Sequence, residues 1–516
     1  MQTNTRFTAT VSAIVALGGF LMGFDASVIS GVVGFIETEF ALSKLQVGWA
    51  VASLTLTATL GMLVSGPLSD RYGRRSVLQW AALLFLLSAI ASALAPGFWT
   101  LVAARMLGGL GVGAALIVAP MYIAELSPAA VRGRMVSINQ LNIVIGISAA
   151  FFSNYLILRL GQSGGSVVEQ LSLGVSGWRW MLGAEALPAL VYLGALRFVP
   201  ESPRWLSMHG RDDEALAILA RATDPVAARA ALDAIPGEAT NKQQGRWHEL
   251  FAPAMRTVLL IGIAIAVVQQ ITGINAVFFY APMIFEQSGI GTNAAFMQAV
   301  LVGLTNLVFT VVAMMLIDRI GRRPLLLAGL TGITVSMLVL AWGFSSAVYQ
   351  LPGENVAELP ASIVQPLQTQ LGNTSFDSDR EFRNAVVAII GIEEYRQHRS
   401  ALIAASAQLN PMVILVGILG FVASFAVSLG PVMWVLFSEL YPNRLRGLAV
   451  SFVGLINSGV SFTVQLVFPW ELENLGNATT FLLFAIFAIL GLVFVATKVP
   501  ETRGRTLEQL EQQLTA

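Results

Sequence analysis

The chain has 516 residues and a formal net charge of zero; 55% of its residues are hydrophobic and only 12% are charged. Soluble domains carry about 25% charged residues, so this composition excludes a water-soluble globular protein. The balanced charge, with basic residues only in short clusters, argues against a nucleic-acid partner. The lack of cysteine excludes disulfides, thiolate metal sites and cysteine nucleophiles.

Apolar stretches recur along the whole chain, and each has the roughly 20 residues that a helix needs to cross a hydrocarbon core. The sequence therefore predicts an all-α membrane protein with twelve transmembrane helices in two six-helix halves. No obvious small-residue cleavage site follows the first stretch, so we expect a retained span. The expected spans lie near residues 8–33, 46–68, 76–95, 99–122, 135–158, 178–198, 257–281, 294–317, 325–347, 411–437, 448–469 and 478–498.

The positions of Lys and Arg predict the orientation of these spans. Most of the 30 basic residues fall at the termini and in the even-numbered connections, and basic residues concentrate on the cytoplasmic side of a membrane. We therefore expect a multi-pass protein of the cytoplasmic (inner) membrane with both termini in the cytoplasm. The expected divisions are an N-terminal half at 1–198, a cytoplasmic linker with short amphipathic helices at 199–256, a C-terminal half at 257–500 and a cytoplasmic tail at 501–516.

Three short motifs recur in the same order in the two halves, which indicates an internal duplication. Residues 70–75 (DRYGRR) return as 318–323 (DRIGRR), 125–128 (ELSP) as 439–442 (ELYP), and 199–202 (VPES) as 499–502 (VPET). Duplicated halves of this kind favour alternating access to a site between them near the membrane midplane, although a duplication alone is also compatible with a scaffold.

The charged residues of these motifs are candidates for a cytoplasmic gate. Surface ion pairs contribute about 0–1 kcal/mol each, so several of them can stabilise one conformation and still allow the protein to leave it. The predicted gating residues are Asp70, Arg74, Glu125, Arg132, Glu201, Asp318, Arg322, Glu439, Arg446 and Glu501.

The second half is longer than the first because of an insertion at 348–410. This segment is too polar to span a membrane. It joins the ninth and tenth spans, so we expect it on the periplasmic face. A surface insertion without a function of its own is favoured there over a lid that covers the transport site.

These motifs, together with five further strings, resemble the sugar porter family of the major facilitator superfamily over nearly the whole chain. The strings are 23–25 (GFD), 200–206 (PESPRWL), 269–275 (QQITGIN), 430–434 (GPVMW) and 500–504 (PETRG). The resemblance implies a twelve-helix transporter of hexoses, pentoses or cyclic polyols, and it is nearest to bacterial sugar:proton symporters.

Polar side chains inside the spans are candidates for substrate binding. A sugar presents hydroxyls that both donate and accept, so a selective site needs amides and an aromatic face. Gly273 favours an irregular helix, and such backbone is tolerated where it lines a wet cavity. Intramembrane amides also join helices without binding anything, but the resemblance favours binding. The predicted substrate-binding residues are Gln140, Gln269, Gln270, Asn275, Tyr280, Asn306, Trp434 and Asn457.

Several positions depart from the family's pattern. Met22 stands where xylose transporters carry an aromatic residue, Phe279 replaces a tyrosine, and Ser458 stands where tryptophan is common. These departures leave the sugar unidentified. Ala426 occupies a position that is glutamate in animal facilitative carriers and alanine in bacterial symporters, and this points to the proton-driven branch of the family.

Very few ionisable residues lie inside the spans, and each is a functional candidate because burying a charge in a membrane is costly. They are Asp25, Arg105 and Glu185, all in the first half. An Asp beside an Arg loses its proton, whereas an Asp in an apolar wall keeps it, so movement of Arg105 would switch the proton affinity of Asp25. The resemblance implies the same roles for Asp25 and Arg105. A permanent buried ion pair is the alternative.

Other functions remain open to different degrees. An uncoupled sugar facilitator, an inositol-type polyol symporter and a drug exporter would share the fold. The soluble segments are too small for a nutrient sensor's signalling domain. We do not expect an enzyme, a cofactor or a metal, because the three histidines lie in loops and no catalytic constellation is evident. The expected partners are a sugar or polyol, the proton and membrane lipid, and the expected active form is a monomer.

Overall fold

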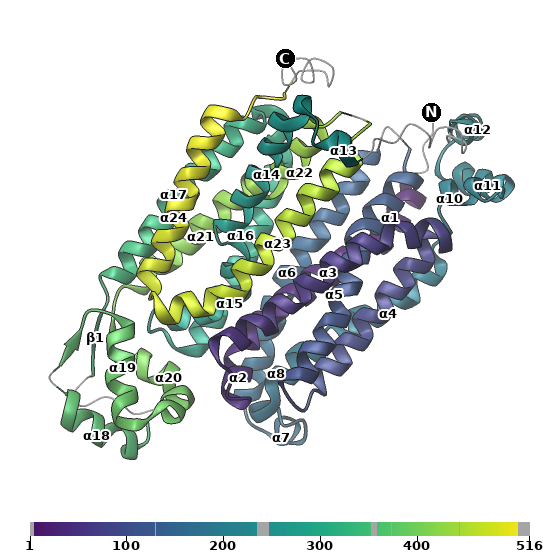
Figure 1. Cartoon of the computed structure of the whole chain (residues 1–516). Coiled ribbons are helices and arrows are strands. Elements are labelled where there is room, and N and C mark those ends of the chain that lie inside the picture. Colours follow the sequence, from purple (N-terminus) through teal and green to yellow (C-terminus); the bar gives the residue numbers. More distant parts are fainter. Residues whose placement is uncertain are drawn as a thin grey trace. The chain divides into compact units, whose positions relative to one another are not determined.

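The structure, a computed structural model, describes residues 5–128, 131–234, 247–351, 359–372, 374–442 and 444–503. Within these residues, twelve helices are long and apolar enough to cross a membrane, which confirms the expected number (Figure 1). The spans are α1 (Thr5–Val28) with η1 (Ile29–Gly31), α3 (Lys44–Tyr72), α4 (Arg74–Ala93), α5 (Phe98–Leu126), α6 (Arg132–Gln162), α8 (Leu173–Gly183) with α9 (Ala186–Ala195) and η2 (Leu196–Phe198), α14 (Arg256–Ile271) with α15 (Ile274–Glu286), α16 (Gly291–Ile320), α17 (Arg322–Ser345), α21 (Pro411–Val427) with α22 (Leu429–Leu440), α23 (Arg446–Asn474) and α24 (Asn477–Lys498).

Three of these spans are interrupted, and the predicted irregularity at Gly273 is confirmed. Gly273 separates α14 from α15 and has a left-handed φ of 92°, which glycine adopts without steric cost. A Cβ atom at this position would also lie 2.7 Å from the ring of Phe484. The other interruptions are at Ser428, between α21 and α22, and at Glu185, between α8 and α9.

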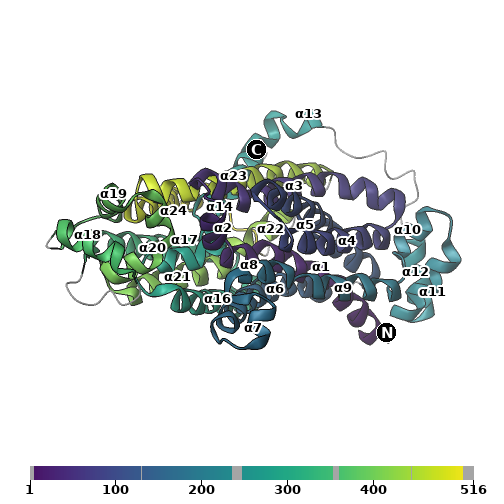
Figure 2. The ribbon, with the colours of Figure 1, turned by 90° about the horizontal axis from the view of Figure 1, so that it is seen from below.

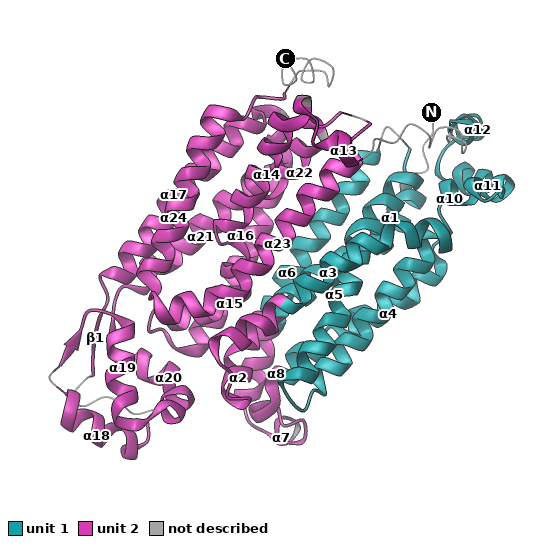
Figure 3. Ribbon diagram, viewed as in Figure 1, with its two compact units in different colours: residues 1–28, 53–153, 179–246 teal, residues 29–52, 154–178, 247–516 magenta. Residues whose placement is uncertain are grey.

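The contacts within the chain divide it into two compact units, which are described separately (Figure 3). Unit 1 comprises residues 1–28, 53–153 and 179–246. Its apolar core lies among α1, α4, α5 and α9 and contains the fully buried rings of Phe85, Tyr122 and Tyr192. Glycines let the helices approach closely: a Cβ atom on Gly113 of α5 would lie 2.1 Å from the carbonyl oxygen of Ala58 on α3.

Short helices follow the last span of unit 1, in the segment predicted to be a linker. They are α10 (Pro203–Met208), α11 (Asp212–Ala222) and α12 (Pro225–Asp233), and they lie together at one end of the unit (Figure 1). Their apolar faces bury Leu206, Ala215 and Ala228 in a small core. The later part of the expected linker, residues 235–246, lies outside the described residues, and α13 (Trp247–Leu250) and η4 (Pro253–Met255) precede α14.

Unit 2 comprises residues 29–52, 154–178 and 247–516, so it includes two stretches from the first half of the sequence. Those stretches carry α2 (Val33–Glu39) and α7 (Ser166–Gln170). They pack closely on second-half helices: a Cβ atom on Gly48 would lie 2.0 Å from the carbonyl oxygen of Leu466 on α23. Among the helices of this unit, α17 packs along α21 and α24.

The insertion at 348–410 forms a small folded subdomain of unit 2 rather than an irregular loop. It contains α18 (Ala361–Leu371), α19 (Asp379–Ile390) and α20 (Ile392–Ser406), together with a three-stranded antiparallel sheet in the order β2 (Ser375–Phe376), β1 (Val348–Gln350), β3 (Ala407–Gln408). Its core is formed by Tyr349, Leu367 and Phe382, and its helices gather at one end of the unit in both views (Figures 1 and 2).

Candidate transport site

The three charged residues predicted inside the spans meet in unit 1. Asp25 lies on α1, Arg105 on α5 and Glu185 at the break before α9, and each is at most 2% exposed. Arg105 donates from Nη1 to Asp25 Oδ1 at 3.3 Å and from Nη2 to the Asp25 carbonyl at 3.2 Å. Glu185 interacts electrostatically with both Asp25 and Arg105. The fold thus assembles one buried cluster from three separate spans.

The composition of this cluster suits it to holding a proton. One guanidinium neutralises one carboxylate, so two ionised carboxylates would leave an uncompensated negative charge in a sealed, apolar site. One proton bound by either Asp25 or Glu185 restores neutrality. In the described part of the chain, Asp25 Oδ2 and Glu185 Oε1 are buried without a hydrogen-bond partner, as is the Nε–H donor of Arg105.

Four of the predicted substrate-binding amides form one hydrogen-bonded network in unit 2. Gln270 Nε2 donates to Asn457 Oδ1 at 3.1 Å, and Asn457 Nδ2 donates to Gln269 Oε1 at 2.8 Å. Asn275 Nδ2 donates to Gln270 Oε1 at 2.8 Å. The break at Gly273 places Asn275 on a new helix that turns its amide back toward Gln270.

Two polar residues that the sequence reading missed extend this network along α23. Ser461 Oγ accepts from Asn275 Nδ2 at 2.6 Å and from Gln465 Nε2 at 2.8 Å. Both residues follow Asn457 at intervals of four, so a helical spacing of polar residues was the available signal. Tyr280 is fully buried and donates to the Gln465 carbonyl at 2.9 Å, so it supports the part of the network that lies on α23.

The remaining predicted binding residues lie outside this network. Gln140 is an exposed residue of α6 in unit 1. In unit 2, Asn306 is 5% exposed on α16, and Trp434 is 45% exposed on α22, with its ring 6.0 Å from that of Phe437.

The repeated motifs of unit 1 form a charge network at the ends of its spans. Arg74 forms a two-point ion pair with Glu125, with both N–O distances at 3.1 Å, and also contacts Asp70 at 3.0 Å. Glu201 Oε1 accepts from the backbone N–H of Arg75 at 3.1 Å. A Cβ atom on Gly73 would lie 2.3 Å from Glu201 Oε2, so the glycine of the motif makes room for this carboxylate.

The same arrangement recurs in unit 2. Arg322 donates from Nη2 to Glu439 at 2.8 Å, and the backbone N–H groups of Arg322 and Arg323 each donate to Glu501 at 3.1 Å. A Cβ atom on Gly321 would lie 2.8 Å from Glu501 Oε2. Each network therefore links spans within its own unit, and the sequence repeat is also a repeat of contacts.

Three predicted gating residues stand apart from these contacts. Arg132 begins α6, and Arg446 begins α23 and donates to the Tyr441 carbonyl at 3.4 Å. The side chain of Asp318 lies outside the described residues.

Comparison with known proteins places these features in a family. The family model described as sugar (and other) transporter matches residues 11–357 and 387–514. The chain belongs to this family. It is 35% identical to the arabinose-proton symporter of Bacillus subtilis, over 98% of this chain and 95% of that protein, and 32% identical to the D-xylose-proton symporter of Escherichia coli, over 99% and 96%.

A solved structure of the E. coli xylose transporter, in an inward open conformation, matches with a TM-score of 0.74 and 30% identity over 98% of this chain and 99% of that one. The protein therefore has the major facilitator fold, with twelve membrane-spanning helices in two six-helix halves, and it is a multi-pass membrane transporter rather than an enzyme.

Proposed function

We propose that this protein carries a monosaccharide across the cytoplasmic membrane together with a proton, by alternating access. The observation that supports this most is the pairing of two separate polar sites. A buried cluster with two carboxyls and one guanidinium lies in unit 1, and a hydrogen-bonded amide network lies in unit 2. Bacterial relatives that match over nearly the whole chain are an arabinose-proton and a xylose-proton symporter.

The proton site in this proposal is Asp25, with Arg105 as its switch and Glu185 as a relay or second acceptor. While Arg105 pairs with Asp25, the carboxylate is stabilised in its charged form. When Arg105 moves away, an isolated carboxylate in an apolar wall takes up a proton. The buried, unpartnered Oδ2 of Asp25 is the atom available to receive it.

The sugar site is centred on the amides Gln269, Gln270, Asn275 and Asn457. Each amide has a donor and an acceptor, so a sugar hydroxyl can replace one amide partner without leaving the other unpaired. The half-exposed indole of Trp434 supplies an apolar face for the C–H surface of the ring. Gln140, Asn306 and Tyr280 complete the proposed set, with Tyr280 acting through its bond to Gln465.

The remaining assignments extend the proposal to the whole chain. Both termini face the cytoplasm, the halves are divided at 198 and 257 by the linker, and the protein works as a monomer in membrane lipid. In this orientation the repeated charge networks at residues 70–75 and 318–323 lie on the cytoplasmic side. They keep each half rigid while the gate at that face opens and closes.

The test is uptake into proteoliposomes of labelled arabinose, xylose, glucose and myo-inositol, with and without an imposed pH gradient. We expect one or more monosaccharides to accumulate only with the gradient, and Gln270→Ala to reduce that uptake at least tenfold. Downhill uptake without accumulation would identify a facilitator. Preferential accumulation of myo-inositol would identify a polyol symporter, and no uptake of any of the four would overturn the proposal.

A further inference from the structure

The hydrogen bonds of the amide network in unit 2 run in one direction, and two backbone carbonyls fix that direction. Asn457 Nδ2 donates to the Ala266 carbonyl at 3.0 Å, and Gln269 Nε2 donates to the Leu429 carbonyl at 3.0 Å. A carbonyl oxygen can only accept a hydrogen bond. These two partners therefore decide which end of each amide is the nitrogen.

The direction passes from these two amides to the others. Asn457 Oδ1 accepts from Gln270 Nε2 at 3.1 Å, and Gln270 Nε2 also donates to Gln269 Oε1 at 3.2 Å, so both N–H groups of Gln270 are used. The oxygen of Gln270 is left as an acceptor, and it receives Asn275 Nδ2 at 2.8 Å. A reversed Asn275 amide would place its oxygen against Gln270 Oε1, acceptor against acceptor.

The network ends at Asn275, where only the oxygen remains available. Asn275 Nδ2 donates to Gln270 and also to Ser461 Oγ at 2.6 Å, which uses both of its N–H groups. Among the described residues, no donor is bonded to Asn275 Oδ1. Asn275 is half-buried, whereas Gln269, Gln270 and Asn457 are at most 8% exposed. A solute that reaches Asn275 therefore meets a carbonyl oxygen rather than an N–H group.

Ser461 holds Asn275 in this orientation. It is 4% exposed on α23, and it accepts from Gln465 Nε2 at 2.8 Å as well as from Asn275. The Gln465 carbonyl in turn accepts from the Tyr280 hydroxyl at 2.9 Å. Because Tyr280 and Asn275 both lie on α15, that helix is bonded to α23 at two points. Without the Ser461 hydroxyl, the Asn275 amide would keep one of its two bonds and could turn about it.

We propose that Asn275 Oδ1 accepts a hydrogen bond from one hydroxyl of the sugar, and that Ser461 is the positioning residue that sets this specificity. The inference rests on the proposed function, because it assumes that the amide network binds the sugar. A hydroxyl can donate to this oxygen without breaking any bond of the network. A substrate analogue that cannot donate at that carbon leaves the oxygen desolvated and unpaired.

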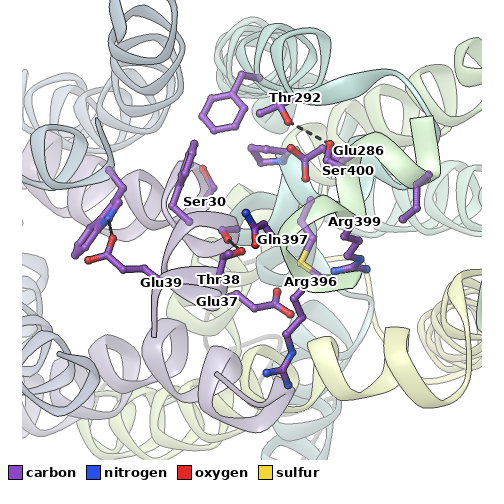
Figure 4. Close-up of a pocket in the computed structure, with 18 of the residues that line it drawn as sticks. Ser30, Glu37, Thr38, Glu39, Glu286, Thr292, Arg396, Gln397, Arg399 and Ser400 are labelled. Atoms are coloured by element: carbon purple, nitrogen blue, oxygen red, sulfur yellow. Dashed lines mark hydrogen bonds between the residues drawn. The ribbon is translucent and has the colours of Figure 1, made fainter. Parts of the chain in front are cut away.

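A separate pocket at the other end of α15 does not share these features. Glu37 and Glu286 line it, and among its described lining residues none belongs to the amide network (Figure 4). The Oε1 atom of Gln287, which has no partner within the described structure, is buried rather than open to this pocket. Sugar bound in the pocket would not respond to changes at Asn275 or Ser461, so variants at these residues distinguish the two places.

The test compares a sugar hydroxyl with fluorine, which cannot donate a hydrogen bond, and with hydrogen. Equilibrium dialysis against purified full-length protein gives the Kd of arabinose, xylose and glucose, and then of the monodeoxyfluoro and monodeoxy analogues of whichever binds most tightly. We expect one hydroxyl at which both replacements weaken binding roughly tenfold or more, and by factors within about twofold of each other. A protein group that donated at that position would instead bind the fluorine analogue more tightly than the deoxy analogue.

Variants assign this hydroxyl to Asn275. The penalty for fluorine should fall below about threefold in Asn275→Ala, which removes the acceptor, and in Ser461→Ala, which releases the amide. Ser461→Thr keeps the hydroxyl and should retain the penalty. Thr463→Ala is the matched control, because Thr463 is an exposed residue of α23 whose hydroxyl donates to the Gly459 carbonyl. The control should bind the parent sugar and its analogues as wild type does.

The outcomes separate this inference from the proposed function. If the fluorine analogue binds as well as the parent sugar at every position whose Kd depends on Asn275, then Asn275 does not accept from the sugar and the inference is wrong. An unchanged penalty in Ser461→Ala would overturn the role of Ser461. Either result, together with uptake driven by a pH gradient, would leave the transport proposal standing. No binding and no uptake of any sugar would instead contradict the proposed function itself.

Discussion

At the scale of single residues, Gly108 determines the space available to the buried carboxylate of Asp25. A Cβ atom on Gly108 would lie 2.5 Å from Asp25 Oδ2 and 2.6 Å from Ser88 Oγ. Gly108→Ala should therefore overpack the cluster, lower the free energy of unfolding by about 1–3 kcal/mol and reduce sugar accumulation. Detergent-mixture unfolding and proteoliposome uptake measure the two effects. Gly194→Ala, where nothing lies within 4 Å, is the control, and equal behaviour of the two variants would contradict the steric argument.

Some of these residues could be found from the sequence, and others could not. Asp25, Arg105 and Glu185 stand out because charges are rare inside apolar spans, and the fold does bring them together. Ser461 and Gln465 were missed because single hydroxyl and amide residues occur in many transmembrane helices, so their helical spacing alone carried little weight. The unpartnered atom of Gln287 depends on packing, which no sequence pattern reports.

At the scale of elements, the two copies of the charge network differ in burial, and this allows a comparison within one protein. Arg74 and Glu125 have side chains 3% and 7% exposed, whereas Arg322 and Glu439 are 12% and 24% exposed. Glu125→Gln should therefore destabilise the protein more than Glu439→Gln. The loss should stay below the roughly 3–5 kcal/mol of an uncompensated buried charge, because Asp70 still contacts Arg74. Thermal unfolding in detergent tests the order, and the reverse order would contradict it.

The insertion can be removed at a position where its two ends already meet. Tyr349 and Ala407 are paired in the antiparallel sheet, so residues 350–406 can be replaced by a two-residue Asn-Gly turn. We expect this variant to insert normally and to transport at least half as fast as wild type, because the amide network and the buried charge cluster do not include the insertion. Loss of transport in a correctly folded variant would mean that the subdomain takes part in the transport cycle.

At the scale of the whole molecule, hydropathy was enough to predict the twelve spans, because burial in lipid requires long apolar stretches whatever the tertiary packing. The break at Gly273 also followed from the sequence. The division into compact units did not follow from the sequence. Residues 29–52 and 154–178 pack with the second half, and such contacts depend on side-chain fit. The insertion was predicted to be polar and outside the membrane, but its folded core of Tyr349, Leu367 and Phe382 was not foreseen.

Coupling between the two sites is a property of the whole molecule. One proton moving through about 100 mV releases about 2.3 kcal/mol, which sustains a roughly fifty-fold concentration of a neutral sugar if one proton moves per sugar. Accumulation is therefore a sensitive measure of coupling, whereas exchange of sugar across the membrane at equal concentrations needs no proton gradient.

The most direct test compares wild type with Asp25→Asn in proteoliposomes, with accumulation, equilibrium exchange and sugar binding measured on the same preparations. The substitution removes the titrating group and keeps the size and hydrogen bonding of the side chain. We predict that the variant binds and exchanges sugar but no longer concentrates it, because the amides proposed to bind the sugar lie in unit 2. If the variant still concentrates sugar, and loses that ability when the pH gradient and membrane potential are collapsed, then the proton is carried elsewhere and the central claim is wrong.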